Sequence, residues 1–385
     1  MAIPKLLMVV NNDWFFLSHR KAVAIAALNK GYDVTVVTRD NGHFEEINSC
    51  GLKTICLKMN PTGMNIFQEI GTLLFLYKIY KKEKPCIVHH VGPKVSLWGT
   101  IAARWAGVPS IVNAVSGLGV IFNSKNIASR CVSILYKISH RGKSNLQVIF
   151  QNEEDKSFYL NKGFITKDKC RFIMGSGIDL KEYTYTPEPD SKKIRICFTA
   201  RMIKEKGVYE IIESARILFN DYQDRIQFIL CGGLAEEGRA NYVSPDELKP
   251  KNMPSDYFIW LGKRDDVLFQ LQNCHIFIFP SYYNEGLPKS CIEANAVGRP
   301  IITTDNVGCR DTVIDGYNGY IIPVKNAKTL AEKIKCLIED KDKRLLMGKN
   351  ARKYAEEHFD INDVVERHLS IYRSGLIAQG FHFDR

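Results

Sequence analysis

Long apolar segments are missing from this 385-residue chain. No uncharged run reaches the roughly 18 apolar residues that a membrane-spanning helix requires. The start of the chain holds a strand-like run from Lys5 to Val10 in place of a signal peptide. We therefore expect a protein that is soluble or attached to a membrane only peripherally.

Cysteine pairs with metal-binding spacing are also missing. The eleven cysteines are scattered, odd in number and never arranged as C-x-x-C, which argues against a disulfide framework and against a zinc site. We interpret them as reduced, mostly buried thiols of a cytoplasmic protein. A G-x-G-x-x-G motif is absent as well, and this weakens the case for a dehydrogenase.

Acidic residues are scarce in the first half of the chain. Residues 1–190 carry 24 Lys/Arg and 15 Asp/Glu, a net charge of +9, whereas the remainder carries 29 and 27, a net charge of +2. Residues 78–143 hold eleven basic side chains and one acid, Glu83. An anionic surface is therefore an expected partner. Nucleic acid is not, because no recognition motif accompanies the charge.

Apolar blocks alternate with amphipathic stretches along the chain, which is typical of βαβ units that build parallel sheets. The length predicts roughly two domains. We predict an α/β fold with doubly wound domains over residues 1–182 and 191–360, joined by a polar, proline-broken linker. A C-terminal helix and tail, residues 361–385, are expected to pack back toward the first domain. Because open α/β sheets bind ligands at the carboxyl ends of their strands, we expect a cleft between the domains.

The predicted strands and helices follow this alternation. Strands are predicted at 5–10, 32–37, 53–57, 86–91, 110–113, 146–150, 171–174, 194–200, 226–231, 258–261, 275–279, 300–304 and 319–323. Helices are predicted at 18–30, 64–82, 94–106, 125–140, 153–161, 207–219, 265–272, 288–297, 327–339, 342–358 and 361–373. Residues 232–257 are predicted to form an irregular insertion.

Two carboxylates, Glu285 and Glu293, lie where a strand, a short loop and a helix follow one another. The apolar run ends at Pro280 and Ser281, and Pro288 suits the first turn of a helix, whose amide groups attract anions. Glu293 would lie in the second turn, where it could accept hydrogen bonds from a ribose diol, while Glu285 faces the loop. The spacing suits a nucleotide sugar.

Two cations, Arg201 and Lys206, follow the first predicted strand of the second domain and precede a helix at Gly207. A guanidinium, an ammonium group and a helix N-terminus together can neutralise a diphosphate without a divalent metal. The alternative is a solvated, charged turn.

Three motifs together resemble retaining glycosyltransferase family 4. They are Arg201-x4-Lys206-Gly, then Gly262-Lys-Arg-Asp-Asp-Val, then Glu285-Gly-Leu-Pro-x4-Glu293-Ala-x-Ala-x-Gly-x-Pro. The resemblance covers nearly the whole chain. It implies the GT-B fold of two facing Rossmann-like domains, a nucleotide-sugar donor, retention of configuration, no cofactor and no metal. A UDP-sugar is the favoured donor.

The resemblance also implies roles for individual residues. Arg201 and Lys206 would hold the leaving diphosphate, and Glu285 a hydroxyl of the donor sugar, as the catalytic set. Glu293 would bind the ribose hydroxyls. The remaining donor-binding positions lie around the sugar, the phosphate and the base: Gly286, Leu287, Pro288, Lys289, Lys263 and Arg264, with Pro288 only shaping its loop because it lacks an amide.

One loop departs from the family pattern. Ser116 and Gly117 stand in Ser-Gly-Leu-Gly, where relatives often carry a His-Gly pair whose histidine contacts the donor sugar. This form resembles a bacterial subgroup that extends polyprenyl-diphosphate-linked sugars, including N-acetylgalactosamine transferases acting on undecaprenyl-diphosphate acceptors. It implies a role in the synthesis of surface polysaccharide, such as capsule or lipopolysaccharide, or of a glycan.

Acceptor-binding residues are predicted in the first domain: Asn12, Asp13, His19 and Lys94. Asp13 and His19 could orient the acceptor hydroxyl, and Lys94 could meet its phosphates. In the alternative interpretation, Ser18 caps a helix and Asp13 makes a turn.

A membrane surface is predicted from residues 66–82, which are strongly apolar and end in basic residues. The alternative is a core-packed helix with a solvated lysine tail. We expect a cytoplasmic location, peripheral on the inner face of the plasma membrane. A UDP-sugar 2-epimerase of the same architecture and a non-catalytic membrane scaffold remain alternative functions.

Overall fold

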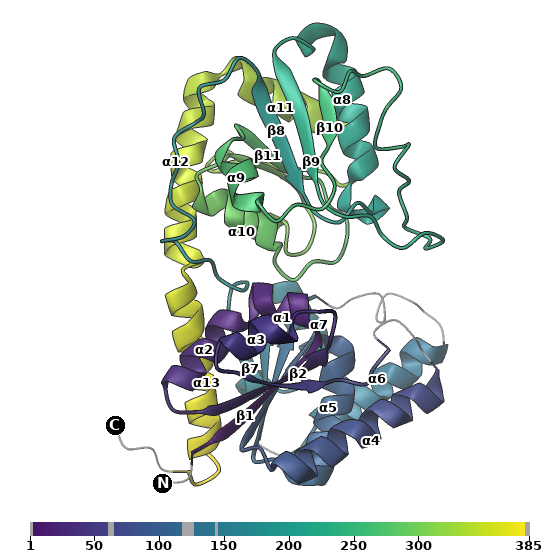
Figure 1. Cartoon of the computed structure of the whole chain (residues 1–385), viewed down its shortest axis with the longest axis vertical. Helices are drawn as coiled ribbons and strands as arrows, with labels where there is room; N and C mark the ends of the chain where they lie inside the picture. The colour runs from purple at the N-terminus through teal and green to yellow at the C-terminus, as the bar shows by residue number, and fades with distance from the viewer. Residues whose placement is uncertain (1–2, 61–64, 118–126, 143–144, 382–385) are drawn as a thin grey trace. The chain divides into compact units, whose positions relative to one another are not determined.

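The computed structural model describes residues 3–60, 65–117, 127–142 and 145–381. The chain divides into two compact units. The first unit comprises Met1–Gly177 and Ile361–Arg385, and the second comprises Ile178–Asp360. Figure 1 shows that each unit is a parallel sheet with helices on both faces.

The first sheet has seven parallel strands in the order β3-β2-β1-β4-β5-β6-β7. Its strands are β1 (Lys5–Asn12), β2 (Asp33–Arg39), β3 (Lys53–Cys56), β4 (Ile87–Val91), β5 (Ser110–Val115), β6 (Leu146–Phe150) and β7 (Cys170–Phe172). Its helices are α1 (Asp13–His19), α2 (Lys21–Asn29), α3 (Phe44–Ser49), α4 (Ile66–Glu83), α5 (Pro93–Ala106), α6 (Ile127–His140), α7 (Glu153–Asn161) and α13 (Ile361–Ile377), with a 3-10 turn η1 (Lys167–Lys169). Strands β4, β5 and β6 are buried throughout, which explains their continuous apolar runs.

Two apolar cores lie on opposite faces of this sheet. One packs α4, α5 and α6 against the sheet, and Figure 1 shows these helices side by side. The other packs α2 and α13 against it and includes Tyr372 and Leu376 from α13. The last helix of the chain therefore completes the unit that begins with the first strand.

The second sheet has six strands in the order β10-β9-β8-β11-β12-β13, and every described pair is parallel. Its strands are β8 (Ile194–Thr199), β9 (Ile226–Cys231), β10 (Phe258–Trp260), β11 (Ile276–Phe279), β12 (Ile301–Thr304) and β13 (Gly319–Ile322). Its helices are α8 (Val208–Tyr222), α9 (Val267–Gln272), α10 (Lys289–Ala296), α11 (Ala327–Glu339) and α12 (Lys341–His358), with 3-10 turns η2 (Lys204–Lys206) and η3 (Arg310–Thr312).

Each predicted strand overlaps an observed one, and the predicted α/β fold class is confirmed. Three expectations are corrected, and two short helices, α1 and α3, were not predicted. Asp13–His19 forms α1, so Ser18 lies inside a helix and does not cap one. The helix expected over 18–30 begins as α2 only at Lys21. Five of the eleven free cysteines are buried, so the prediction that most of them are buried is wrong.

Residues 232–257 contain no regular helix or strand, as predicted, yet Val243 and Leu248 anchor the segment in the core of the second unit. Across the described ranges, every helix is too short or too polar to cross a bilayer.

Candidate active site

The second unit places its predicted site residues around the switch point of its sheet. Strands β8 and β11 are neighbours, and the chain leaves β8 toward β9 on one side and arrives at β11 on the other. Ligands of open α/β sheets bind at the carboxyl ends of the strands at such a switch point. The segment after β8 carries Arg201 and Lys206, and the segment after β11 carries Glu285.

Two glycines allow close backbone contacts here, Gly207 between the segments after β8 and β11, and Gly308 between those after β12 and β11. Gly207 has a φ of 79°, and a Cβ there would collide with the carbonyl oxygen of Pro280. Gly308 has a φ of 75°, and a Cβ there would collide with the carbonyl oxygen of Gly286. Only glycine fits such backbone contacts without strain. The η2 turn is further fixed because the Tyr282 amide donates to the carbonyl oxygen of Glu205 over 2.8 Å.

Lys206 and Glu285 form an ion pair at the centre of this arrangement. Their side chains are only 12% and 13% exposed. The Lys206 ammonium also lies 5.0 Å from the ring centre of Phe279 and 5.5 Å from that of Tyr283, within the range of cation–π attraction. Ser281 donates a hydrogen bond of 3.1 Å to Glu285. The two predicted catalytic residues are therefore in contact and held from several sides.

Arg201 lies near this pair in sequence but differs from it in environment. Its side chain is exposed and has no ion pair or side-chain hydrogen bond among the residues that the structure describes. Lys263 is likewise exposed and unpaired within the described chain. Arg264 instead makes two 2.7 Å hydrogen bonds to Asp266, which lower the pKa of that carboxyl to about 2. The Arg264 side chain is thus engaged within its own loop.

Glu293 lies on α10 and is partly buried. Burial raises the pKa of this carboxyl to about 6, although Lys289 and a hydrogen bond from Tyr183 oppose the shift. Burial together with the Glu293 charge also raises the pKa of Tyr183. Tyr183 was predicted only as part of a linker, so its contact with a site residue was missed.

The loop before α10 is buried at Gly286, Leu287 and Pro288. Pro288 is the N-cap residue with a φ of −65°, and α10 itself begins at Lys289, one residue later than predicted. The amides of Cys291 and Ile292 donate to the Pro288 carbonyl over 3.1 and 3.2 Å. The proline therefore shapes the entry into the helix, as expected of a residue without an amide hydrogen.

In the first unit, Asn12 ends β1 and Asp13 starts α1. Asp13 is fully buried and accepts hydrogen bonds from the Trp14 amide at 2.7 Å and from the Asn41 amide at 2.6 Å. Burial raises the pKa of Asp13, but hydrogen bonds from Asn41, Trp14 and His43 more than offset this, so that the pKa lies below its usual value. These contacts give Asp13 a structural role, although it begins α1 and does not form the turn of the alternative interpretation. A contact between Asp13 and an acceptor stays a prediction.

Lys94 lies in the first turn of α5 and is also largely buried. Its ammonium pairs with Glu69 of α4 at 2.5 Å and donates to the Asn60 carbonyl at 2.5 Å. Trp98 donates to the same carboxylate at 2.6 Å. In the structure Lys94 therefore has an anionic partner, Glu69. A contact between Lys94 and the acceptor phosphates stays a prediction.

The other first-unit candidates are His19, the last residue of α1, and Ser116 and Gly117. The His19 ring is stacked on Phe15 with 4.0 Å between ring centres. Ser116 and Gly117 follow β5, and Gly117 has a φ of 95°. Leu118 and Gly119, the rest of the Ser-Gly-Leu-Gly motif, lie outside the described residues. Within the described ranges, His, Cys, Asp and Glu side chains form no group of three that could hold a metal ion.

Two doubly wound parallel sheets, matched over nearly the whole chain by solved GT-B structures, define the GT-B class of protein. Comparison with known proteins agrees with this assignment. Residues 182–354 match the model of glycosyl transferases group 1, and residues 5–152 match the model of glycosyl transferase 4-like domains.

Similar proteins extend over nearly the whole chain. A Campylobacter jejuni N,N'-diacetylbacillosaminyl-diphospho-undecaprenol alpha-1,3-N-acetylgalactosaminyltransferase is 31% identical, covering 93% of this chain and 97% of the relative. The capsular polysaccharide biosynthesis glycosyltransferase CapM of Staphylococcus aureus is 28% identical, covering 90% and 91%. A solved structure of Anabaena Alr3699/HepE in complex with UDP-glucose has a TM-score of 0.78 at 16% identity, covering 96% and 99%. The chain belongs to the group 1 glycosyltransferase family and is a glycosyltransferase.

Proposed function

We propose that this glycosyltransferase moves a sugar, with an N-acetylhexosamine as the best candidate, from a UDP donor onto a polyprenyl-diphosphate-linked sugar, with retention of configuration. The product would enter the synthesis of bacterial surface polysaccharide or glycan. The Campylobacter relative supports the acceptor class and the N-acetylhexosamine, since its name describes transfer of N-acetylgalactosamine to an undecaprenol-linked sugar. CapM supports a polysaccharide product.

The observation that carries the proposal is the Lys206–Glu285 pair at the switch point, with exposed Arg201 in the same segment. When a nucleoside diphosphate leaves a sugar, negative charge grows on the phosphate oxygens and positive charge on the anomeric carbon. Fixed cations placed at the phosphate lower the barrier, and this kind of electrostatic stabilisation is commonly the largest catalytic contribution. Lys206 and Arg201 would supply the cations, while Glu285 would orient a sugar hydroxyl.

The test is a panel of UDP- and GDP-sugars offered with a polyprenyl-diphosphate-linked sugar. Nucleotide release is followed together with the mass of the product and its anomeric configuration. We expect release from a UDP-sugar only when acceptor is present, with one sugar added and its configuration retained. Turnover of the UDP-sugar without acceptor would favour the alternative function of a UDP-sugar 2-epimerase. No turnover with any donor would favour the other alternative, a non-catalytic membrane scaffold.

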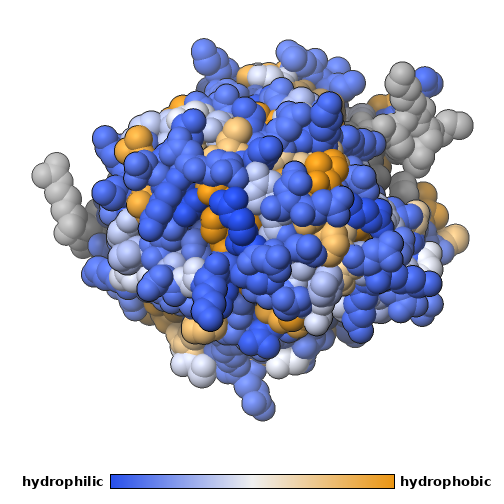
Figure 2. Space-filling model, turned by 90° about the horizontal axis from the view of Figure 1, so that it is seen from above, coloured by the Kyte–Doolittle hydropathy of each residue, from blue (hydrophilic) through white to orange (hydrophobic). Residues whose placement is uncertain are grey.

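We further propose that α4 and its neighbours bind an anionic membrane surface on the cytoplasmic side. Helix α4 exposes apolar side chains at Ile66, Phe67, Ile70 and Leu74, and α6 exposes Ile134 and Ile138. By contrast, Figure 2 shows a face where hydrophilic residues predominate and hydrophobic ones form small, separate patches. Gathered apolar side chains with basic residues nearby are typical of interfacial attachment.

Binding to anionic vesicles tests this attachment. We expect the protein to float with vesicles of phosphatidylglycerol at low salt and to dissociate as salt screens the charges. Equal recovery with uncharged vesicles, or no recovery with either, would contradict the proposal.

A further inference from the structure

A groove of about 650 Å³ runs along α4 in the first unit. One wall is α4 itself, and the other is the segment that leaves β3. The lining residues are Lys58, Met59, Asn60, Gln68, Gly71, Thr72, Leu74, Phe75 and Lys78. Its volume falls in the range of sites that hold small molecules, roughly 300–1,000 Å³.

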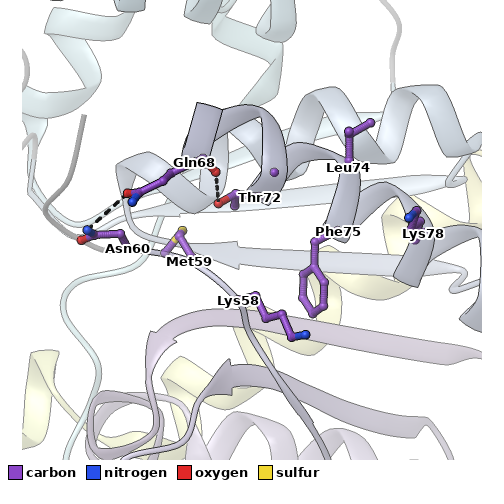
Figure 3. Close-up of a pocket in the computed structure, with 9 residues that line it drawn as sticks. Lys58, Met59, Asn60, Gln68, Thr72, Leu74, Phe75 and Lys78 are labelled. Carbon is purple, nitrogen blue, oxygen red and sulfur yellow. Dashed lines mark hydrogen bonds between the residues drawn. The ribbon is translucent and has the colours of Figure 1, made fainter. Parts of the chain in front are cut away.

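The groove combines an apolar middle with two ammonium groups. Figure 3 shows Phe75 pointing from α4 toward Lys58, while Met59 lies on the facing segment on the side of Asn60 and Thr72. Lys58 and Lys78 are exposed, and neither has a carboxylate partner among the described residues. The lining includes no acidic residue. The groove therefore suits a ligand that carries both a negative group and an apolar chain.

The position of the groove next to the exposed apolar side chains of α4 suggests that such a ligand comes from the membrane. Leu74 lies at its rim and points away from Phe75 in Figure 3, and it belongs to the exposed apolar set of α4 together with Ile66, Phe67 and Ile70. Phe67 is 81% exposed, more than any other large apolar side chain described. If this set enters the headgroup region of a bilayer, as proposed above, the groove opens where lipid headgroups lie.

We propose that this groove binds a single anionic glycerophospholipid, with its phosphate between Lys58 and Lys78 and the start of one acyl chain along Met59 and Phe75. The inference rests on the proposed membrane attachment and adds a defined lipid site to it. Diffuse attraction to a charged leaflet depends equally on all nearby cations. Binding in the groove would depend only on the cations that line it.

A soluble, short-chain phosphatidylglycerol below its micelle-forming concentration is the probe, because a monomeric lipid presents no charged membrane surface to the other cations of the protein. Titration calorimetry on the full chain should show one lipid bound per protein. Phosphatidylcholine of the same chain length should bind about tenfold more weakly, because its choline group repels the two ammonium groups.

A matched pair of double variants tests the site. Lys58→Gln with Lys78→Gln should weaken phosphatidylglycerol binding about tenfold or more. Lys81→Gln with Lys82→Gln removes the same charge from the last turn of α4 outside the groove, and binding should change less than about twofold. Equal loss in both double variants would overturn the proposal in favour of diffuse attraction.

A plug variant tests the groove independently of charge. Gly71 lines the groove, is exposed, and a Cβ at this position would meet no other atom within 4 Å. Gly71→Leu should fill the groove and abolish lipid binding without lowering the melting temperature, since glycine is the weaker helix former. Gly71→Ala gains helix propensity with little added volume and serves as its control.

Three further outcomes would overturn the proposal. They are the absence of saturable phosphatidylglycerol binding, full binding by Gly71→Leu, and equal affinity for a short uncharged polyprenol, which would assign the groove to the acceptor chain. Lipid titration uses neither donor nor acceptor. Loss of glycosyl transfer in the panel assay with lipid binding intact would therefore remove the proposed function alone.

Discussion

Both units hold a lysine at the switch point of their sheet, and in both the lysine is paired with a glutamate. Lys206 follows β8 and pairs with Glu285, while Lys94 follows β4 and pairs with Glu69. All four side chains are between 10% and 13% exposed. Judged by burial and charge alone, the two pairs are alike.

Their surroundings differ. Lys94 also binds the Asn60 carbonyl, and Glu69 also accepts from Trp98, so that the pair ties α4, α5 and the segment after β3 together. Lys206 is flanked by the faces of Phe279 and Tyr283, and its partner Glu285 lies in the loop before α10. Because the second pair joins the two loops of the switch point itself, we propose catalysis for Lys206 and, as the alternative to acceptor binding, a structural role for the Lys94–Glu69 pair.

The largest effect is expected at Lys206. Lys206→Ala should reduce kcat by about a hundredfold or more, because a fixed cation at the leaving phosphate is lost. The measurement is turnover at saturating donor, and Lys204→Ala in the same turn is the control. Near-normal turnover of the Lys206 variant would show that the Lys206–Glu285 pair is not catalytic.

Lys94→Ala should instead lower the free energy of unfolding, by about 3 kcal/mol, because Glu69 would remain buried without its cation. Urea denaturation measures this loss, and adding Glu69→Leu should recover part of it. Unchanged stability with a raised KM for the acceptor would show that Lys94 binds substrate, as its sequence position predicted.

Arg201→Ala should separate activity from stability. The side chain is exposed, so the free energy of unfolding should change by less than about 0.5 kcal/mol. A lost charge-assisted hydrogen bond to the diphosphate should cost roughly 1.5–3 kcal/mol in kcat/KM. Arg216→Ala, an exposed arginine on α8, is the matched control. Equal kinetics for the two variants would exclude Arg201 from the site.

Glu293 should give the smallest effect, which is a dependence on pH. As pH rises, its ionisation should lower the free energy of unfolding and raise the affinity for the donor. Its pKa is raised from 4.5 to about 6, so the folded state binds more protons than the unfolded state between these pH values. The free energy of unfolding should therefore fall as pH rises through this window, by roughly 2 kcal/mol in total. Donor affinity should rise through the same window, because the carboxylate accepts from ribose hydroxyls.

Glu293→Gln should flatten both dependences. Unfolding followed as a function of pH and titration with UDP below and above pH 6 are the measurements. A pH profile of unfolding that is the same in Glu293→Gln and the natural protein would show that another group titrates.

The strands were predictable because parallel strands buried on both faces are continuous apolar runs, as in β4 and β11. The missed helices carry no such signal. Helix α3 has six residues and buries only Ile47, and α1 buries only Asp13 and Phe16, so neither shows a helical apolar period.

The candidate site residues were named from motifs, but the contact between Lys206 and Glu285 was not predicted. Lys206 and Glu285 are 79 positions apart, and their contact depends on β8 lying next to β11. A one-dimensional pattern does not state the order of strands in a sheet. For the same reason, the partners of Lys94 on α4 and of Glu293 at Tyr183 were missed.

The path of α13 has a consequence for biosynthesis. The first unit is discontinuous in sequence, because its core takes Val364, Leu369, Ile371, Tyr372 and Leu376 from α13, which is translated after the second unit. Domains generally fold as units while the chain emerges from the ribosome. The second unit, which is continuous in sequence, can thus finish folding before α13 is made, whereas the first unit lacks the cover of one sheet face until α13 has been synthesised.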